Sequence, residues 1–117
     1  METGMEGEDL AKNWLVQKGF EIVERNWRSG HLEVDLIAVK NGRLHFFEVK
    51  CRRSEKFGTP ETAISKTKLK NLMNAADIYC RRNPKYRKVQ FDVLAITIGE
   101  KTEYFLIEDV YLVEPRR

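Results

Sequence analysis

An Asn41-Gly42 pair between two apolar segments constrains the fold of this chain more than any other feature. Asn-Gly flanked by alternating apolar residues is the strongest short-range signal for a β-hairpin, because both residues accept the positive φ that its turn requires. We therefore predict strands over about Leu32–Val39 and Leu44–Cys51. Both predicted strands are largely apolar.

Charged residues interrupt these two strands. Asp35 lies in the first strand, and Glu48 and Lys50 lie near the end of the second. Side chains two positions apart on a strand point to the same face, so we expect Glu48 and Lys50 to project together. Charges inside a sheet cost free energy unless they are paired or bind a metal. Two interpretations follow: a site for a hard divalent cation and an activated water, or buried ion pairs of Lys50 with Asp35 and Glu48.

Helical and strand periodicities divide the rest of the chain. Before the hairpin we predict a helix over about Met5–Lys18 ended by Gly19, a strand from Phe20 to Asn26 or Trp27, and a polar segment Arg28–His31. After it we predict a short helical turn at Thr59–Glu61 and a helix capped by Ser65 and ended by Asn83-Pro84. Two further strands are predicted over Val89–Ile98 and Glu103–Ile107. This order favours an α/β sandwich around a mixed sheet of about five strands, with the antiparallel hairpin at its centre.

The composition limits the classes of protein to which the chain can belong. Its 117 residues suggest one domain, residues 1–117, and 42% hydrophobic with 33% charged residues is typical of a soluble, folded chain. No apolar segment approaches the about 20 residues that span a bilayer, and no signal peptide is visible, so we expect a cytoplasmic protein without a membrane partner. Cys51 and Cys80 are expected to be free thiols. A net charge of +3 permits nucleic-acid binding without establishing it.

Several short blocks follow one another along most of the chain. They are Gly7-Glu8, Gly19-Phe20, Arg25-Asn26 with Arg28, the segment from Glu33 to Ala38, Phe47-Glu48-Val49-Lys50 followed by Arg52, Phe57-Gly58, Lys68, Ala76 and Phe91-Asp92-Val93. A helix bearing an acid, a strand Asp, a Glu-x-Lys on the next strand and a second helix resemble the PD-(D/E)XK nuclease superfamily. The blocks resemble more closely the YraN-like family of small bacterial proteins, which includes predicted endonucleases. Archaeal Holliday junction resolvases are similar in layout.

The resemblance implies a restriction-endonuclease-like three-layer sandwich and an endonuclease that acts on DNA, with branched or damaged DNA as candidate substrates. The implied cofactor is Mg²⁺ or Mn²⁺, and Mg²⁺ needs few protein carboxylates because it keeps several waters. The implied metal ligands are Asp35, Glu48, the Val49 carbonyl and Glu8, the last directly or through water. Lys50 is implied to position or deprotonate the attacking water, or to stabilise charge on the phosphate. Catalysis would thus rest on Lys50, Asp35, Glu48 and Glu8.

Basic residues in segments predicted to border this site are candidates for DNA binding. They are Arg25, Arg28, Arg52, Arg53 and Lys56, together with Lys68 on the second helix. Lysine and arginine there would bind phosphates with release of counterions. An ordinary charged surface is the alternative interpretation, and for Lys68 a solvated helix lysine. Glu33 is interpreted as a supporting acid rather than a ligand.

A second class of function stays open beside the enzyme. The chain is small, and Leu32 and Gln90 replace the Gly and Arg that are usual in the family. Both facts allow a catalytically inactive module that retains the nuclease fold and binds nucleic acid or recruits a partner, and a purely structural protein is a third alternative. Cleavage of two strands would favour a homodimer. We expect Asp92 to pair with an arginine or with backbone donors as a structural residue, and we see no histidine metal cluster at His31 or His45.

Overall fold

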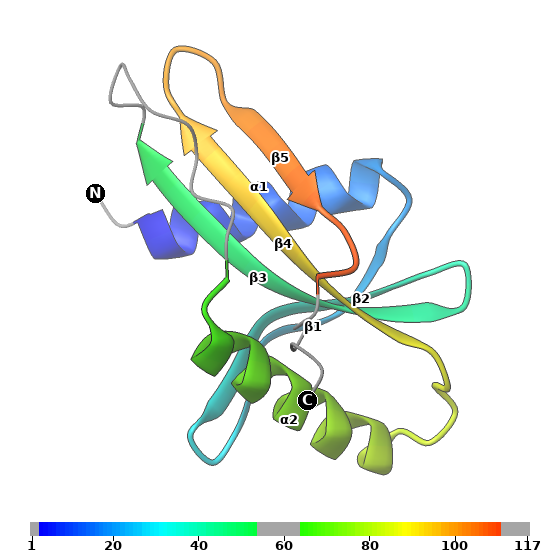
Figure 1. Cartoon of the computed structure of the whole chain (residues 1–117). Helices are drawn as coiled ribbons and strands as arrows, with labels where there is room; N and C mark the ends of the chain where they lie inside the picture. The colour runs from blue at the N-terminus through cyan, green and yellow to red at the C-terminus, as the bar shows by residue number, and fades with distance from the viewer. Residues whose placement is uncertain (1–2, 54–63, 111–117) are drawn as a thin grey trace, which may run out of the picture.

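The computed structural model describes residues 3–53 and 64–110, and its elements follow the predicted order (Figure 1). They are α1 (Thr3–Gln17), β1 (Glu21–Ser29), β2 (Leu32–Lys40), β3 (Arg43–Arg53), α2 (Lys66–Arg82), β4 (Val89–Ile98) and β5 (Glu103–Ile107). The predicted turn at Thr59–Glu61, Lys56, Phe57-Gly58 and the chain beyond Val110 lie outside the described residues.

The five strands form one sheet in the order β1-β2-β3-β4-β5. The pairs β1–β2, β2–β3 and β4–β5 are antiparallel, whereas β3 and β4 are parallel and are connected through α2. Figure 1 shows α1 behind the sheet and α2 in front of it. The predicted α/β sandwich with a mixed five-stranded sheet is therefore confirmed, and it is consistent with a nuclease-like fold.

Each helix closes a separate hydrophobic core on its own face of the sheet. Ala11 and Leu15 of α1 are fully buried in a cluster with Phe47. Leu72 and Ala76 of α2 are buried in the other cluster, against strand residues of β2 and β3. Full burial of one leucine side chain stabilises the fold by about 1.5–3 kcal/mol, so both layers are needed to cover the sheet.

Local turn and cap signals act where the sequence predicts them. Asn41 and Gly42 have φ values of 53° and 75° and join β2 to β3. Gly19, at φ 97°, follows the end of α1. The Ser65 side chain caps α2 by accepting a hydrogen bond from the Lys68 backbone N–H at 3.1 Å. These residues fix the element boundaries from which the site is built.

The predicted polar segment Arg28–His31 is wrong in its first half. β1 continues through Arg28 and Ser29, which pair with Glu33 and Leu32, so only Gly30 and His31 form the turn. β1 lies at the edge of the sheet, where polar side chains are solvated and the apolar alternation used to find strands is absent. In the described part of the chain, no helix is long and apolar enough to cross a membrane.

Candidate metal and nucleic-acid site

The strands β2 and β3 part at Asp35 and Glu48. Their pairing is recorded from Lys40↔Arg43 to Leu36↔Phe47 and goes no further. At the next position, Asp35 Oδ2 accepts a hydrogen bond from the Val49 backbone N–H at 2.8 Å, so a side chain takes the place of the main-chain partner. β3 continues beyond this point beside β4 alone, as Figure 1 shows. The opening gives Asp35 and Glu48 access to solvent within a mostly buried sheet.

The packing of β2 changes at the same place. Val34 packs into the core under α2, whereas Leu36, two residues later, packs into the core under α1. A regular strand would put both on one face. On β1, Asn26 falls opposite Asp35 and has a φ of 52°, a left-handed conformation that asparagine tolerates better than most residues. The sheet is thus distorted at the level of Asp35.

Asn26 also brings the first helix to the site. Its side-chain Nδ2 donates a hydrogen bond to Glu8 Oε1 at 2.8 Å, so the predicted site residue Glu8 faces the strand position opposite Asp35. Sequence reasoning missed this role of Asn26. The available signal was its place in the Arg25-Asn26 block, together with the tolerance of asparagine for positive φ.

A cleft with a volume of 330 Å³ lies over the parted strands. Its polar lining comprises His31, Glu33, Asp35, Glu48, Lys68 and Asn71. Lys68 Nζ lies 2.7 Å from Glu48 Oε2, with side-chain exposures of 61% for Lys68 and 15% for Glu48. The structure therefore brings Lys68 to the predicted site from the first turn of α2. The cleft combines acids that can bind a cation with a lysine that can meet an anion.

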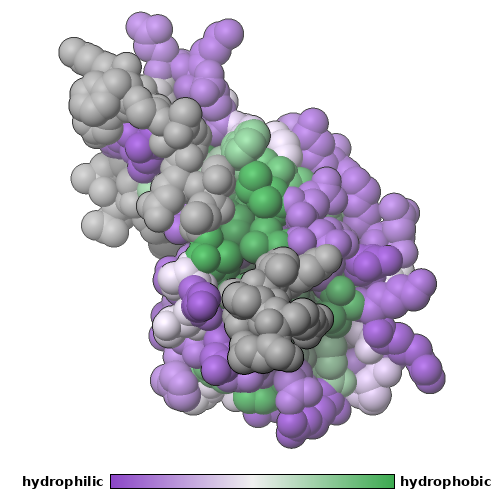
Figure 2. Space-filling model, viewed as in Figure 1, coloured by the Kyte–Doolittle hydropathy of each residue, from purple (hydrophilic) through white to green (hydrophobic). Residues whose placement is uncertain are grey.

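Lys50 lines a second cleft, of 260 Å³, which shares Glu48, Val49 and Lys68 with the first. The strand registers Lys50↔Ala95 and Ala95↔Phe105 place these three residues in one row across β3, β4 and β5. Phe105 is 51% exposed, and Figure 2 shows hydrophobic residues at the surface in the middle of this face, with hydrophilic residues around them. An apolar surface thus borders the second cleft on the side away from the acids.

The electrostatics of the site centre on Asp35. Burial of its carboxyl group is the largest influence and raises the Asp35 pKa from 3.8 to about 6. The hydrogen bond from Val49 N–H lowers the pKa, while the neighbouring charges of Glu48, Glu33 and Glu8 raise it. The hydrogen bond to Glu48 raises the pKa of Lys68 and so favours its charged form. Burial therefore disfavours the charged form of Asp35, and the neighbouring acids add to this effect.

This pKa predicts that ionised Asp35 destabilises the fold. Because its pKa is higher in the folded protein, the free energy of unfolding should fall as pH rises from about 4 to about 6 and stay lowered above that, relative to Asp35→Asn. About two pKa units correspond to at most about 3 kcal/mol. Urea unfolding of both proteins across this pH range measures the difference. Parallel pH curves for the two proteins would contradict the burial of a charged Asp35.

The predicted DNA-binding arginines occupy different surroundings. Arg25 pairs with Asp9 of α1 at 2.7 Å, and Arg28 pairs with Glu33 at 3.4 Å. Arg52 is half-buried in the wall of the second cleft, and Arg53 is exposed near the end of β3. Arg28 thus adjoins the first cleft through Glu33, and Arg52 itself lines the second cleft.

Asp92 has both side-chain and backbone hydrogen-bond partners. Asp92 pairs with His45, whose Nδ1 lies 2.7 Å from Asp92 Oδ2, and with the side chain of Gln90 at 3.0 Å. The expectation of an arginine or backbone donors is confirmed by the Asp109 N–H, which donates to Asp92 Oδ1 at 2.8 Å. His45 and Phe47 face the α1 side of β3, opposite to Glu48. This polar cluster is therefore separate from the site at Asp35.

The donor set fits a magnesium ion better than a transition metal. Within residues 3–53 and 64–110, no three His, Cys, Asp or Glu side chains are grouped closely enough to hold a metal by themselves. Mg²⁺, however, is commonly held by one or two carboxylates, with waters and substrate phosphates completing its shell. Asp35 and Glu48 supply two carboxylates at one opening, and a bound cation would stabilise the ionised form of the buried Asp35 carboxyl group.

Comparisons with known proteins place the chain among relatives of similar length. A family model described as "Uncharacterised protein family UPF0102" matches residues 7–96. A UPF0102 protein from Syntrophomonas wolfei is 41% identical over 100 residues, covering 85% of this chain and 87% of the relative. One from Rhodococcus opacus is 44% identical over 97 residues, with 82% of each chain covered. One from Phocaeicola vulgatus is 38% identical over 109 residues, covering 93% of this chain and 88% of the relative.

Proposed function

This chain belongs to the UPF0102 family, the YraN-like proteins, and on that premise we propose that it is a metal-dependent endonuclease that hydrolyses phosphodiester bonds in DNA. The observation that carries the proposal is the opening between β2 and β3, where Asp35 and Glu48 lie together in one cleft. The names of the relatives state the family alone, so the proposed activity rests on this geometry and on the resemblance to PD-(D/E)XK nucleases.

Each residue of the site would have a separate role in hydrolysis. Asp35, Glu48 and the Val49 carbonyl would hold Mg²⁺ or Mn²⁺, with Glu8 as a further direct or water-mediated ligand. The bound ion supplies charge neutralisation on the phosphate and a more acidic water. Lys50, beside Glu48 on β3, holds the attacking water or takes its proton. Lys68 would exchange its ion pair with Glu48 for the phosphodiester when Glu48 binds the metal, since each of the two groups carries one negative charge.

A specific observation favours a second candidate function. Glu48 already has a cationic partner in Lys68, and an acid satisfied in this way does not require a metal. A protein with this arrangement can bind nucleic acid through the basic residues around the clefts and leave the phosphodiester intact. The binding module predicts DNA binding that is independent of Mg²⁺, and this difference separates it from the nuclease.

Replacement of Lys50 tests the proposal. The wild-type protein and Lys50→Ala are incubated with linear, nicked, flapped and four-way DNA, each with Mg²⁺, with Mn²⁺ or with a chelator. We expect metal-dependent cleavage of at least one substrate by the wild type and a loss of about 10²-fold or more in Lys50→Ala, the usual contribution of a positioned proton-transfer group. Binding of the same DNA by both proteins is measured in parallel.

The outcomes separate the two candidate functions. Cleavage that disappears in Lys50→Ala supports the nuclease and assigns Lys50 to its site. Equal cleavage by both proteins contradicts the role of Lys50. DNA binding without cleavage by either protein supports the binding module instead of the nuclease. The absence of both binding and cleavage contradicts both candidate functions.

A further inference from the structure

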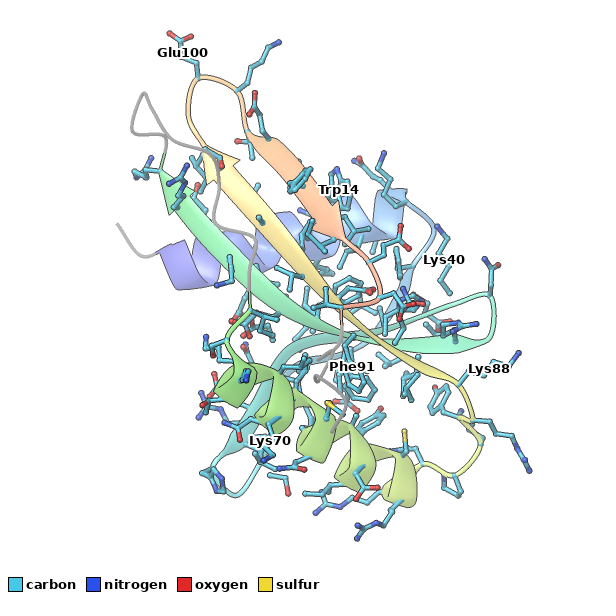
Figure 3. All side chains as sticks on the ribbon, in the orientation of Figure 1. Trp14, Lys40, Lys70, Lys88, Phe91 and Glu100 are labelled. Atoms are coloured by element: carbon cyan, nitrogen blue, oxygen red, sulfur yellow. The ribbon has the colours of Figure 1, made fainter. Side chains whose placement is uncertain are left out.

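A third cavity, also polar, lies on the opposite face of the sheet from Asp35. It has a volume of 490 Å³ and is formed where α1 ends, beside the β2–β3 hairpin and the end of β5. Figure 3 shows Trp14 and Lys40 on this side of the molecule. His45 lines the cavity from β3, whereas Glu48 lines the clefts under α2. The cavity is thus separate from the proposed metal site.

Positive charge dominates the cavity wall. Lys18, Lys40 and Arg43 line it, against one exposed acid, Glu108. In the described part of the chain none of the three cations makes an ion pair. Lys40 is nevertheless held in place, because its Nζ donates to the Lys18 carbonyl at 2.8 Å and lies 4.9 Å from the centre of the Phe20 ring. The wall thus presents three cations for which the described residues supply no ion-pair partner, and Lys40 among them is held in place.

A buried histidine forms the floor of this cavity. His45 is 6% exposed, and its Nδ1 is bonded to Asp92, so Nε2 is the ring nitrogen left for a ligand. Asp92 is itself fixed by Gln90 and the Asp109 N–H. A ring oriented by a buried carboxylate in this way is common at ligand sites, where the second nitrogen faces the ligand. With Nδ1–H donating to Asp92, Nε2 donates to a phosphate oxygen in the imidazolium form and accepts from a phosphate hydroxyl in the neutral form.

Aromatic and apolar groups complete the lining. Trp14, Phe20 and Leu106 contribute carbon surface beside the cations. The Trp14 ring stacks on Tyr104 with a centroid distance of 5.2 Å, and Phe20 packs edge-on against His45. A nucleotide has a planar base next to its phosphate. Rigid aromatic side chains can bind the base while the neighbouring arginine and lysine bind the phosphate. A cavity of 490 Å³ also lies within the size range of small-ligand sites and exceeds what one phosphate needs.

We propose that this cavity binds a nucleotide unit, with its phosphate at Arg43, Lys18 and His45 and its base beside Trp14 and Phe20. The same chemistry is presented by a free mononucleotide and by the phosphorylated end of a DNA strand. Either source would occupy a site on the face of the sheet away from Asp35, and the proposal holds whether or not the chain cleaves DNA.

Fluorescence of Trp14 provides the test, because the protein has two tryptophans and Trp14 alone lines the cavity. The whole protein is titrated, without metal, with thymidine 5′-monophosphate, thymidine, inorganic phosphate and a 5′-phosphorylated oligothymidylate. Trp14→Phe assigns the signal. Arg43→Gln removes a cation from the cavity, and Lys101→Gln, in the exposed β4–β5 turn, removes the same charge elsewhere. Lys18→Gln serves as a second cavity variant if Arg43→Gln does not fold.

We expect saturable quenching by thymidine monophosphate and binding weakened about tenfold or more by Arg43→Gln or Lys18→Gln, but not by Lys101→Gln, since a hydrogen bond to a charged group contributes at least this much. Additional binding of the oligonucleotide identifies a strand end as the source, and binding of the mononucleotide alone identifies a free nucleotide. Equal affinity for inorganic phosphate, equal effects of the cavity and control variants, or no quenching overturns the proposal.

Discussion

Asp35→Asn is expected to reduce metal-dependent DNA cleavage by more than about a hundredfold, because even the loss of a group that only supports a metal ligand costs 10–100-fold. Asparagine is nearly the same shape, and its amide oxygen can still accept the 2.8 Å hydrogen bond from Val49 N–H. It lacks the negative charge that attracts a cation. The measurement is the initial rate of cleavage at saturating Mg²⁺, together with the Mg²⁺ concentration that gives half the maximal rate.

The matched control is Asp77→Asn, which removes the same charge from the exposed surface of α2. It should leave the rate within experimental error of the wild type. Cooperative unfolding of Asp35→Asn separates a lost ligand from a lost fold, since the high pKa of Asp35 predicts no loss of stability. A variant that cleaves at the wild-type rate would contradict Asp35 as a ligand. Failure of the variant to fold would favour the buried ion-pair interpretation.

Most of the fold could be predicted from the sequence because its signals are local. The Asn41-Gly42 turn, the Ser65 cap and Gly19 after α1 each act within a few residues, and the structure has all three. Their positions fix the order and most boundaries of the elements. The extension of β1 through Arg28 and Ser29 was missed because pairing with β2, rather than any apolar pattern, holds this edge strand.

The site was less predictable because it departs from regular geometry. Alternation along β2 assumes an undistorted strand, whereas Val34 and Leu36 pack on opposite faces and Asn26 adopts a positive φ across from Asp35. The hydrogen bond of Asn26 with Glu8 spans 18 positions in the sequence, and no local pattern encodes it. The ion pair of Lys68 with Glu48 depends likewise on where α2 begins after the crossover. Candidate residues could be named from the sequence, but not their partners.

The partner of Asp92 follows from the parallel register of β3 and β4. That register sets His45 beside Gln90 and Phe47 beside Asp92, so the imidazole and the carboxylate meet on the α1 face. The two residues lie 47 positions apart. The sequence predicted an arginine or backbone donors, and the Asp109 N–H is such a donor, whereas the histidine and the glutamine follow from a strand pairing that is set by tertiary contacts.

Asp92→Ala is expected to lower the free energy of unfolding by about 3–5 kcal/mol, the cost of removing one partner from a buried polar pair. Asp92 is 1% exposed and accepts hydrogen bonds from Gln90 and the Asp109 N–H as well as meeting His45. Alanine would leave these groups without their acceptor inside the protein. Urea unfolding followed by circular dichroism measures the loss. Asp77→Ala, which removes an exposed acid, should cost no more than about 1 kcal/mol.

A double-mutant cycle with His45→Phe shows whether Asp92 acts through the histidine. Phenylalanine keeps the ring that packs against Phe20 and Phe47 but removes both nitrogens. Since the pair is in direct contact, we expect a coupling energy of about 1–3 kcal/mol. A coupling near zero, or an Asp92→Ala cost equal to that of Asp77→Ala, would contradict the cluster as a structural anchor. It would also remove the support that holds His45 in the proposed nucleotide cavity, because an unoriented imidazole could not present Nε2 to a phosphate.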